Sequence, residues 1–161
     1  MQDNNAGIAS STKTLRSIKL KEPVIVSPQA TVLDAAVLMA EKNSDSVLVV
    51  GMTGDTSTPT ALKRPLILGI VTVKDAVNRV MAKGLDPSKT IVSKVMTSPV
   101  TTVTPETSLY RVVLLMNQNN FRQVPVLESD RVIGTVTSSM INTSIMSDII
   151  EDIKLIATIF R

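Results

Sequence analysis

The chain of 161 residues contains no cysteine and no histidine. Without cysteine there is neither a disulfide bond nor thiol chemistry. Without histidine the commonest general base and the commonest zinc ligand are both missing. These two absences argue against a hydrolase and against a zinc protein. We therefore expect no catalytic residues, no bound metal and no enzymatic activity.

Aromatic residues are scarce, at 2% of the chain, and the 43% hydrophobic residues are mostly aliphatic, so the core must be built from Val, Ile, Leu, Met and Ala. No apolar run approaches the roughly 18 residues of a membrane span. The net charge of +3 comes from scattered basic residues, which disfavours a nucleic-acid surface. The N-terminus lacks the apolar stretch of a secretory signal, so a cytoplasmic location is expected.

What the chain does contain is a tandem repeat. Residues 28–50 match residues 105–127 at a constant offset of 77 positions. Residues 69–75 (GIVTVKD) match residues 134–140 (GTVTSSM) at an offset of 65 positions, so the first copy carries 12 additional residues. The two motifs differ at Asp75, which becomes Met140 in the second copy. This difference predicts two sites of unequal chemistry.

The repeat predicts how the chain is divided. Residues 1–14 form a polar tail that is expected to be disordered. The first repeat covers 15–84 and the second 85–145, and residues 146–161 extend the last helix. The first repeat contains an insert, residues 51–65, rich in Gly, Thr and Pro. The insert is expected to be a surface loop; the alternative is a lid whose Lys63 or Arg64 contacts a bound anion.

Both repeats show the same order of hydrophobic patterns, β-α-β-β-α. This order predicts an α/β (α+β) fold with two small sheets and helices packed on them. Gly69, in the last predicted strand of the first repeat, would let another backbone approach closely. The expected elements are strands at 24–26, 46–50, 66–73, 100–103, 123–127 and 131–137, and helices at 31–42, 74–83, 108–118 and from 139 onward.

Three segments carry a family resemblance: GIVTVKD, VSKVMTSPVTTVTP (92–105) and FRQVPVL (121–127). Together with the duplication, they make residues 15–145 resemble a pair of CBS (cystathionine-β-synthase) domains. The resemblance implies two CBS repeats packed as a pseudo-twofold module, commonly a homodimer. It also implies a regulatory ligand containing adenosine, such as AMP, ADP, ATP or S-adenosylmethionine, bound in a cleft between the repeats. No other cofactor is implied, and the regulated protein would act in trans.

The motif at Thr72 and Asp75 has two interpretations. A carboxylate can accept hydrogen bonds from both hydroxyls of a ribose, and the adjacent helix start favours phosphate. The same spacing is also a helix capping box, and Thr31 with Asp34 repeats it where only capping is expected. The place of Asp75 within the duplicated framework favours the ligand site.

The resemblance assigns residues to two clefts. The first, stronger cleft is expected to use Ile70, Thr72, Lys74, Asp75, Ser93, Ser98, Pro99, Val100 and Arg122. Arg122 holds a position that can face phosphate in the family, whereas its counterpart Asp45 would repel phosphate. Which cleft each of these two residues serves stays open. The second cleft is expected to use Lys21, Pro23, Val24, Thr137, Ser138 and Ser139. It lacks the ribose carboxylate, and losing a charge-assisted pair costs on the order of 2–3 kcal/mol, so weak binding or a different ligand is expected there.

From Ser139 the chain continues without Gly or Pro, and apolar residues recur at helical spacing (Met146, Ile149, Ile153, Ile156, Phe160). This stripe packs either on the same chain or against a second copy. The regulatory module is the leading hypothesis. The alternative is a structural or oligomerisation protein with an inherited but silent pocket.

Overall fold

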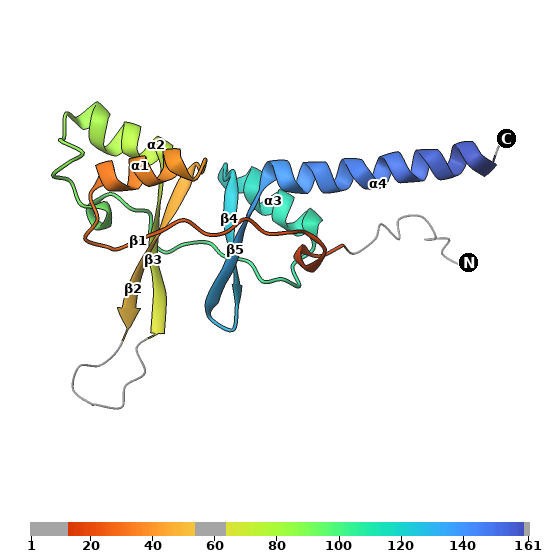
Figure 1. The fold of residues 1–161 in the computed structure, drawn as a ribbon, viewed down its shortest axis with the longest axis horizontal. Helices are drawn as coiled ribbons and strands as arrows, with labels where there is room; N and C mark the ends of the chain where they lie inside the picture. The colour runs from red at the N-terminus through yellow and green to blue at the C-terminus, as the bar shows by residue number, and fades with distance from the viewer. Residues whose placement is uncertain (1–12, 54–63, 160–161) are drawn as a thin grey trace, which may run out of the picture.

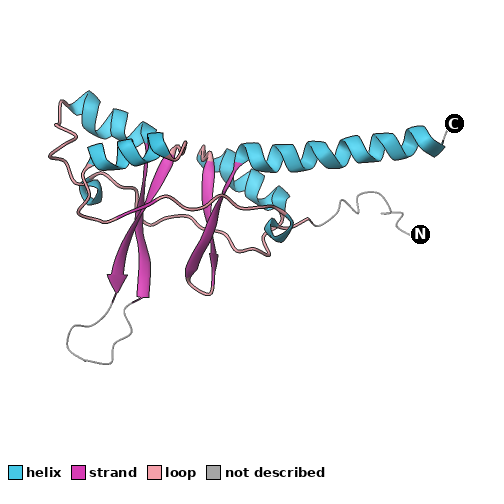
Figure 2. Ribbon diagram, in the orientation of Figure 1, coloured by secondary structure: helices cyan, strands magenta, loops and turns pink. Residues whose placement is uncertain are grey.

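The computed structural model describes residues 13–53 and 64–159. Two halves lie side by side, each built from a β-hairpin with helices, and a long helix projects from the second half (Figure 1). Figure 2 shows both hairpins pointing the same way, with the helices gathered towards the opposite end of the strands. The predicted mixed fold of two repeats is confirmed.

In the first half, three strands form one sheet in the order β1-β2-β3. β1 (Ile25–Val26) runs parallel to β2 (Ser46–Thr53), which pairs in antiparallel fashion with β3 (Arg64–Thr72). Helix α1 (Val32–Glu41) connects β1 to β2. β2 and β3 therefore extend into both ends of the predicted insert, and its central residues 54–63, with the proposed lid residue Lys63, lie outside the described residues.

The first half closes with a composite helix. It begins as α2 (Val73–Asp75), continues as a π-helical stretch (Ala76–Val80) and ends in a 3₁₀ turn (Met81–Lys83). Gly84 then adopts a left-handed conformation with φ of 65°, which glycine reaches without steric cost. Sequence periodicity predicted the extent of this helix but not its change of winding.

The second half contains α3 (Leu109–Asn119), β4 (Gln123–Glu128), β5 (Arg131–Thr137) and α4 (Ser138–Ile159). Its sheet has two strands, so the prediction of a strand at 100–103 is wrong. Only Val103 forms a single parallel bridge, with Val126. The reason is Pro125. In the first half the N–H of Leu48 donates to the carbonyl of Val24 at 2.8 Å, but proline, its counterpart 77 positions later, has no N–H to donate.

The residues that lead into each half pack on the other half. We call residues 13–21 the first leading segment and residues 91–97 the second. Thr14 forms an antiparallel bridge with Ser108 of the second half. Ile91 forms the equivalent bridge with Thr31 of the first half. The two segments therefore cross between the halves in opposite directions (Figure 1).

A second pair of bridges repeats this exchange. Lys21 and Thr135 exchange two backbone hydrogen bonds, of 3.0 and 2.8 Å. Thr97 and Ile70 exchange two more, of 2.8 and 3.0 Å. Because Thr135 lies 65 positions after Ile70, the two bridges are related by the repeat itself. The pseudo-twofold relation is thus visible in individual hydrogen bonds.

Each half has its own aliphatic core, completed by the leading segment of the other. The N-terminal Leu15, 1% exposed, is buried in the second core, and Val92, 0% exposed, in the first. The first core consists of Val26, Val32, Ala35, Met39, Val47, Val49, Val71, Val80, Val92 and Val95. The second consists of Leu15, Val103, Leu109, Val112, Met116, Val124, Val126, Val136 and Ile141.

Two glycines allow the close approach of the leading segments. A Cβ atom on Gly134 would lie 2.6 Å from the Cβ of Leu20 and 3.1 Å from the carbonyl oxygen of Lys21. A Cβ atom on Gly69 would lie 2.6 Å from the Cγ of Met96. Both strands therefore favour a residue without a side chain at this point, although the atoms nearest Gly69 belong to the side chain of Met96 and not to a backbone.

Both ends of the chain differ in part from expectation. Lys13 and Thr14, assigned to the disordered tail, are held in place: the carbonyl of Lys13 accepts a 2.9 Å hydrogen bond from Leu109, and its Nζ lies 2.6 Å from Asp148 of α4. Residues 1–12 of the tail lie outside the described residues. None of the described helices, α4 included, is long and apolar enough to cross a membrane.

Candidate functional site

Thr72 and Asp75 form a capping box at the start of α2. The backbone N–H and Oγ1 of Thr72 donate to Oδ2 of Asp75 at 3.0 and 2.7 Å, and the N–H of Asp75 donates to Oγ1 of Thr72 at 3.1 Å. Thr31 and Asp34 make the same three hydrogen bonds at 2.9, 2.7 and 3.1 Å. Both motifs cap a helix, so the geometry of the box alone does not mark a ligand site.

The surroundings of the two carboxylates differ. Hydrogen bonds from Thr31, first from its side chain and then from its backbone, hold the pKa of the exposed Asp34 below its ordinary value. Asp75 is more enclosed, with its side chain 14% exposed, and its second oxygen, Oδ1, lies 3.2 Å from Nε of Arg79. Both oxygens of Asp75 therefore have partners within the protein.

Arg79 also reaches beyond its own helix. Its Nη1 donates to the carbonyl of Val95 at 2.6 Å, and its Nη2 donates to Oγ1 of Thr97 at 3.0 Å. It thereby ties the carboxylate of Asp75 to the second leading segment. Sequence reasoning missed this residue, although an acid four residues before a base on a helix is a recognised pairing signal.

The structure brings much of the predicted first cleft together. Ile70 is bridged to Thr97, and from there the chain continues directly through Ser98 and Pro99 to Val100. Ser93 lies on the same segment, in the 3₁₀ turn Val92–Lys94. Lys74 lies within α2 and is exposed to solvent. The strand end, the helix start and the incoming segment thus meet at one place.

Arg122 directly precedes Gln123, whose side chain donates a hydrogen bond to Oγ of Ser46, the strand partner of Thr72. The carbonyl of Arg122 accepts a 3.0 Å hydrogen bond from the N–H of Ser138, at the start of α4. Asp45 holds the equivalent place in the first half, where its carbonyl accepts a 3.0 Å bond from Val73. Arg122 and Asp45 thus hold equivalent backbone places beside the last helix of their own halves, and the assignment of the Arg122 side chain to the first cleft stays a prediction.

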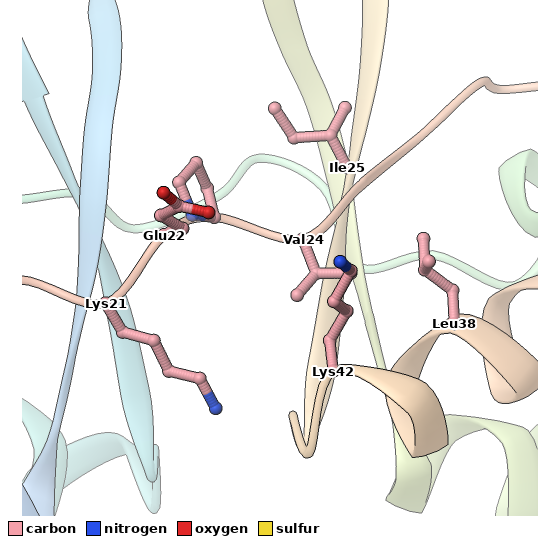
Figure 3. A pocket seen from close by; sticks show the side chains of 7 residues that line it. Lys21, Glu22, Val24, Ile25, Leu38 and Lys42 are labelled. Atoms are coloured by element: carbon pink, nitrogen blue, oxygen red, sulfur yellow. The ribbon is translucent and has the colours of Figure 1, made fainter.

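The predicted second cleft contains a cavity of about 460 Å³ (Figure 3). This volume lies within the roughly 300–1,000 Å³ range of small-molecule pockets. Lys21, from the leading segment, and Lys42, after the end of α1, both line it, and Nζ of Lys21 donates to the carbonyl of Asn43. The lining residues are Lys21, Glu22, Pro23, Val24, Ile25, Leu38 and Lys42.

The other predicted residues of the second cleft lie at the start of α4. Oγ1 of Thr137 accepts from the N–H of Met140 at 3.3 Å and lies 2.9 Å from Oγ of Ser139. This is half a capping box, because Met140 has no carboxylate to return the bond. Ser139 and Met140 line a separate hollow of about 390 Å³ together with Ser144. Neither this hollow nor the larger cavity is lined by a first-cleft residue.

Acidic side chains do not gather into a metal site within the described ranges: no group of three or more of them is placed to hold a metal ion. Two polar features remain: Lys21 and Lys42 at the cavity of the second cleft, and the enclosed carboxylate of Asp75 in the first. This arrangement defines a class: a tandem α+β module with exchanged leading segments, in which a threonine caps the helix that follows the last strand of each repeat.

The chain belongs to the CBS domain family, whose profile matches residues 15–82 and 92–147. Among the curated relatives, the CBS domain-containing protein CBSCBSPB2 of Arabidopsis thaliana is 35% identical over 127 residues, which make up 79% of this chain and 22% of the plant protein. The chain thus spans about a fifth of the length of the first plant relatives that it matches.

Solved structures share the fold. A protein of Burkholderia ambifaria described as a signal-transduction protein with CBS domains matches with a TM-score of 0.68 and 28% identity, over 83% of this chain and 91% of that one. The CBS domain pair of protein MJ0100, in complex with 5′-methylthioadenosine and S-adenosyl-L-methionine, matches with a TM-score of 0.68 and 23% identity, over 84% of this chain and 98% of that one. At 23% identity the likeness extends to the fold alone.

Proposed function

We propose that this chain is a regulatory module that binds an adenosine-containing compound, such as AMP, ADP, ATP or S-adenosylmethionine, between its two repeats. The observation that carries the proposal is the place of the Asp75 carboxylate, in the short helix α2 directly after β3 and joined through Arg79 to the second leading segment. A carboxylate there can accept hydrogen bonds from both ribose hydroxyls. The complex of the MJ0100 pair with two adenosyl compounds supports the ligand class through its shared fold.

The module would act through a shift of population. A ligand held between two halves favours one arrangement of those halves and so alters the surface shown to a partner protein. The leading segments suit this role because each is hydrogen-bonded to one half and leads directly into the other. In this proposal the chain carries out no chemistry itself, acts in trans in the cytoplasm and works as a homodimer.

A thermal-shift screen with AMP, ADP, ATP and S-adenosylmethionine tests the proposal. A ligand at about 100 times its Kd adds about 2.7 kcal/mol to stability, which corresponds to several degrees in Tm for a chain of this size. The Asp75→Ala variant should lose this shift, because the ribose hydroxyls lose their acceptor.

Asp34→Ala is the matched control, because it removes a capping box with the same geometry from α1. Both variants should start from a lower Tm without ligand, and only Asp34→Ala should still respond to the ligand as the wild type does. A wild type that responds to none of the four compounds contradicts the proposed function. An undiminished response in Asp75→Ala contradicts the site.

A second function, structural assembly with a silent pocket, is favoured by two observations. Met140 replaces the carboxylate in the second repeat, and α4 carries exposed apolar side chains such as Ile149 and Ile153. A dimer in light scattering that forms without ligand, together with an unresponsive thermal screen, would favour this function over the first.

A further inference from the structure

Arg79 fills, in the first half, a space that is open in the second. Its guanidinium spans from the π-helical stretch to the carbonyl of Val95 and the hydroxyl of Thr97, and Nε faces Asp75 at 3.2 Å. Single-turn π-helical insertions are frequent at functional sites. One side chain thus joins the carboxylate of the first cleft to the incoming segment.

The second half provides an internal comparison. Its residues at the places of Asp75 and Arg79, 65 positions later, are Met140 and Ser144. Both line the hollow of about 390 Å³, together with Ile18. Ile18 follows the 3₁₀ turn Leu15–Ser17 of the first leading segment, just as Val95 follows the 3₁₀ turn Val92–Lys94 of the second. Without an arginine to cross it, the same junction stays open. In the first half the Arg79 side chain spans this junction, from a helix whose winding also differs from that of α4.

The pair sets the charge at this cleft. Asp75 is 14% exposed, so water screens it only partly, and Arg79 carries a permanent positive charge. Oδ2 already accepts two hydrogen bonds from Thr72, which leaves Oδ1, the oxygen beside Arg79, as the acceptor with spare capacity. A ribose bound to Asp75 would therefore come to lie close to the guanidinium.

On the basis of the proposed function, we propose that Arg79 is the specificity-determining residue of the first cleft and sets its preference for the charge of the group at the 5′ position of a bound adenosine. The guanidinium neutralises Asp75, attracts an anionic 5′ group and repels a cationic one. Without it, the carboxylate is left uncompensated and the preference moves towards cationic ligands.

Three compounds with the same adenosine separate this effect from general binding. AMP carries an anionic 5′ group, 5′-methylthioadenosine a neutral one and S-adenosylmethionine a cationic sulfonium. Their dissociation constants are measured by calorimetry on the full chain as wild type, Arg79→Met and Arg79→Lys. Because a structural defect weakens all three alike, the ratio of their constants reports on charge.

In Arg79→Met we expect the affinity for S-adenosylmethionine relative to that for AMP to rise about tenfold, the change that about 1.4 kcal/mol produces. Arg79→Lys should keep most of the wild-type ratio of dissociation constants, because the positive charge remains although the planar guanidinium is lost. Added salt should reduce the preference of the wild type and have less effect on that of Arg79→Met.

Lys83→Met is the matched control, because it removes the same charge from the next turn of the same helix at an exposed position. It should leave the ratios as in the wild type. Equal weakening of all three ligands in Arg79→Met, or an equal change in Lys83→Met, would overturn the inference and leave the proposed function intact. Failure of all three compounds to bind the wild type would overturn both.

Discussion

At the scale of single residues, Gly134 leaves no room for a side chain. Its neighbours are the Cβ of Leu20 and the carbonyl oxygen of Lys21, and both move only with the backbone. Gly134→Ala should therefore lower the free energy of unfolding by about 1–3 kcal/mol, the usual range for overpacking. Equilibrium unfolding in urea measures this change.

Gly69→Ala gives the comparison within the same molecule. A new Cβ there would meet mainly Sδ and Cγ of Met96, which are flexible and can move aside, and the Cβ of Met96 at 2.9 Å, a longer distance than the 2.6 Å to the Cβ of Leu20 at Gly134. We expect a smaller loss of stability than for Gly134→Ala. The reverse order would show that the first leading segment yields more easily than the second.

Local spacing made part of the site predictable. The capping box of Thr72 and Asp75 follows from residues three apart, and the close approach at Gly69 follows from a glycine within a strand. The contacts of Arg79 were harder to predict, because its partners Val95 and Thr97 depend on which leading segment crosses to which half. A pattern within one repeat does not contain that information.

Among the elements, α4 differs most from its counterpart in the first half. It runs over 22 residues, and its middle part carries apolar side chains that the body does not cover: Met146 is 56%, Ile149 46% and Ile153 59% exposed. Packing on the same chain, one of the two expectations, therefore fails for these three residues. Ile156 and Phe160 of the predicted stripe cannot be assigned in the same way, because their side chains lie outside the described part of the chain. Packing against a second copy stays a prediction.

The double variant Ile149→Glu, Ile153→Glu should not dimerise, because the new charges would have to be buried in the apolar interface. Light scattering over a range of protein concentrations measures the mass. The unfolding midpoint of the isolated chain should change little, since both residues are exposed. Glu151→Gln with Lys154→Gln is the control on the same helix and should keep the mass of the wild type. A wild type that is monomeric at every concentration contradicts this interface.

Hydrophobic periodicity located nearly every helix and strand, because each buries one face in an aliphatic core. It failed at residues 100–103, where the residues have the alternation of a strand but the neighbouring strand β4 cannot pair with them along their length. The signal was present in the sequence: Pro125 aligns with Leu48, and a proline in the neighbouring strand removes the donor that the pairing needs.

For the whole molecule, the exchange of leading segments predicts that damage near the N-terminus appears in the second half. Leu15→Ala removes a side chain from the second core and should cost about 2–5 kcal/mol. Hydrogen exchange should show faster opening of β4 and β5 than of β2 and β3. Val92→Ala, which affects the first core, should give the opposite pattern.

The measurement has a clear contrary result. If Leu15→Ala first weakens the strands of the half that it precedes in sequence, the leading segment does not belong to the second core. Sequence alone could not settle this point. The duplication showed that two similar halves exist and Leu15 had the character of a core residue, but nothing in its neighbours says which core it enters.

The exchange has a consequence for how such a chain can be divided. A cut near Gly84 would give two fragments, each bearing the piece that the other lacks. Because the leading segments occupy equivalent places, two copies of a single repeat could complete one another in the same manner. The covalent link between the repeats is then a tether that raises the local concentration of two complementary pieces, and the tandem chain has the architecture of a two-chain complex joined end to end.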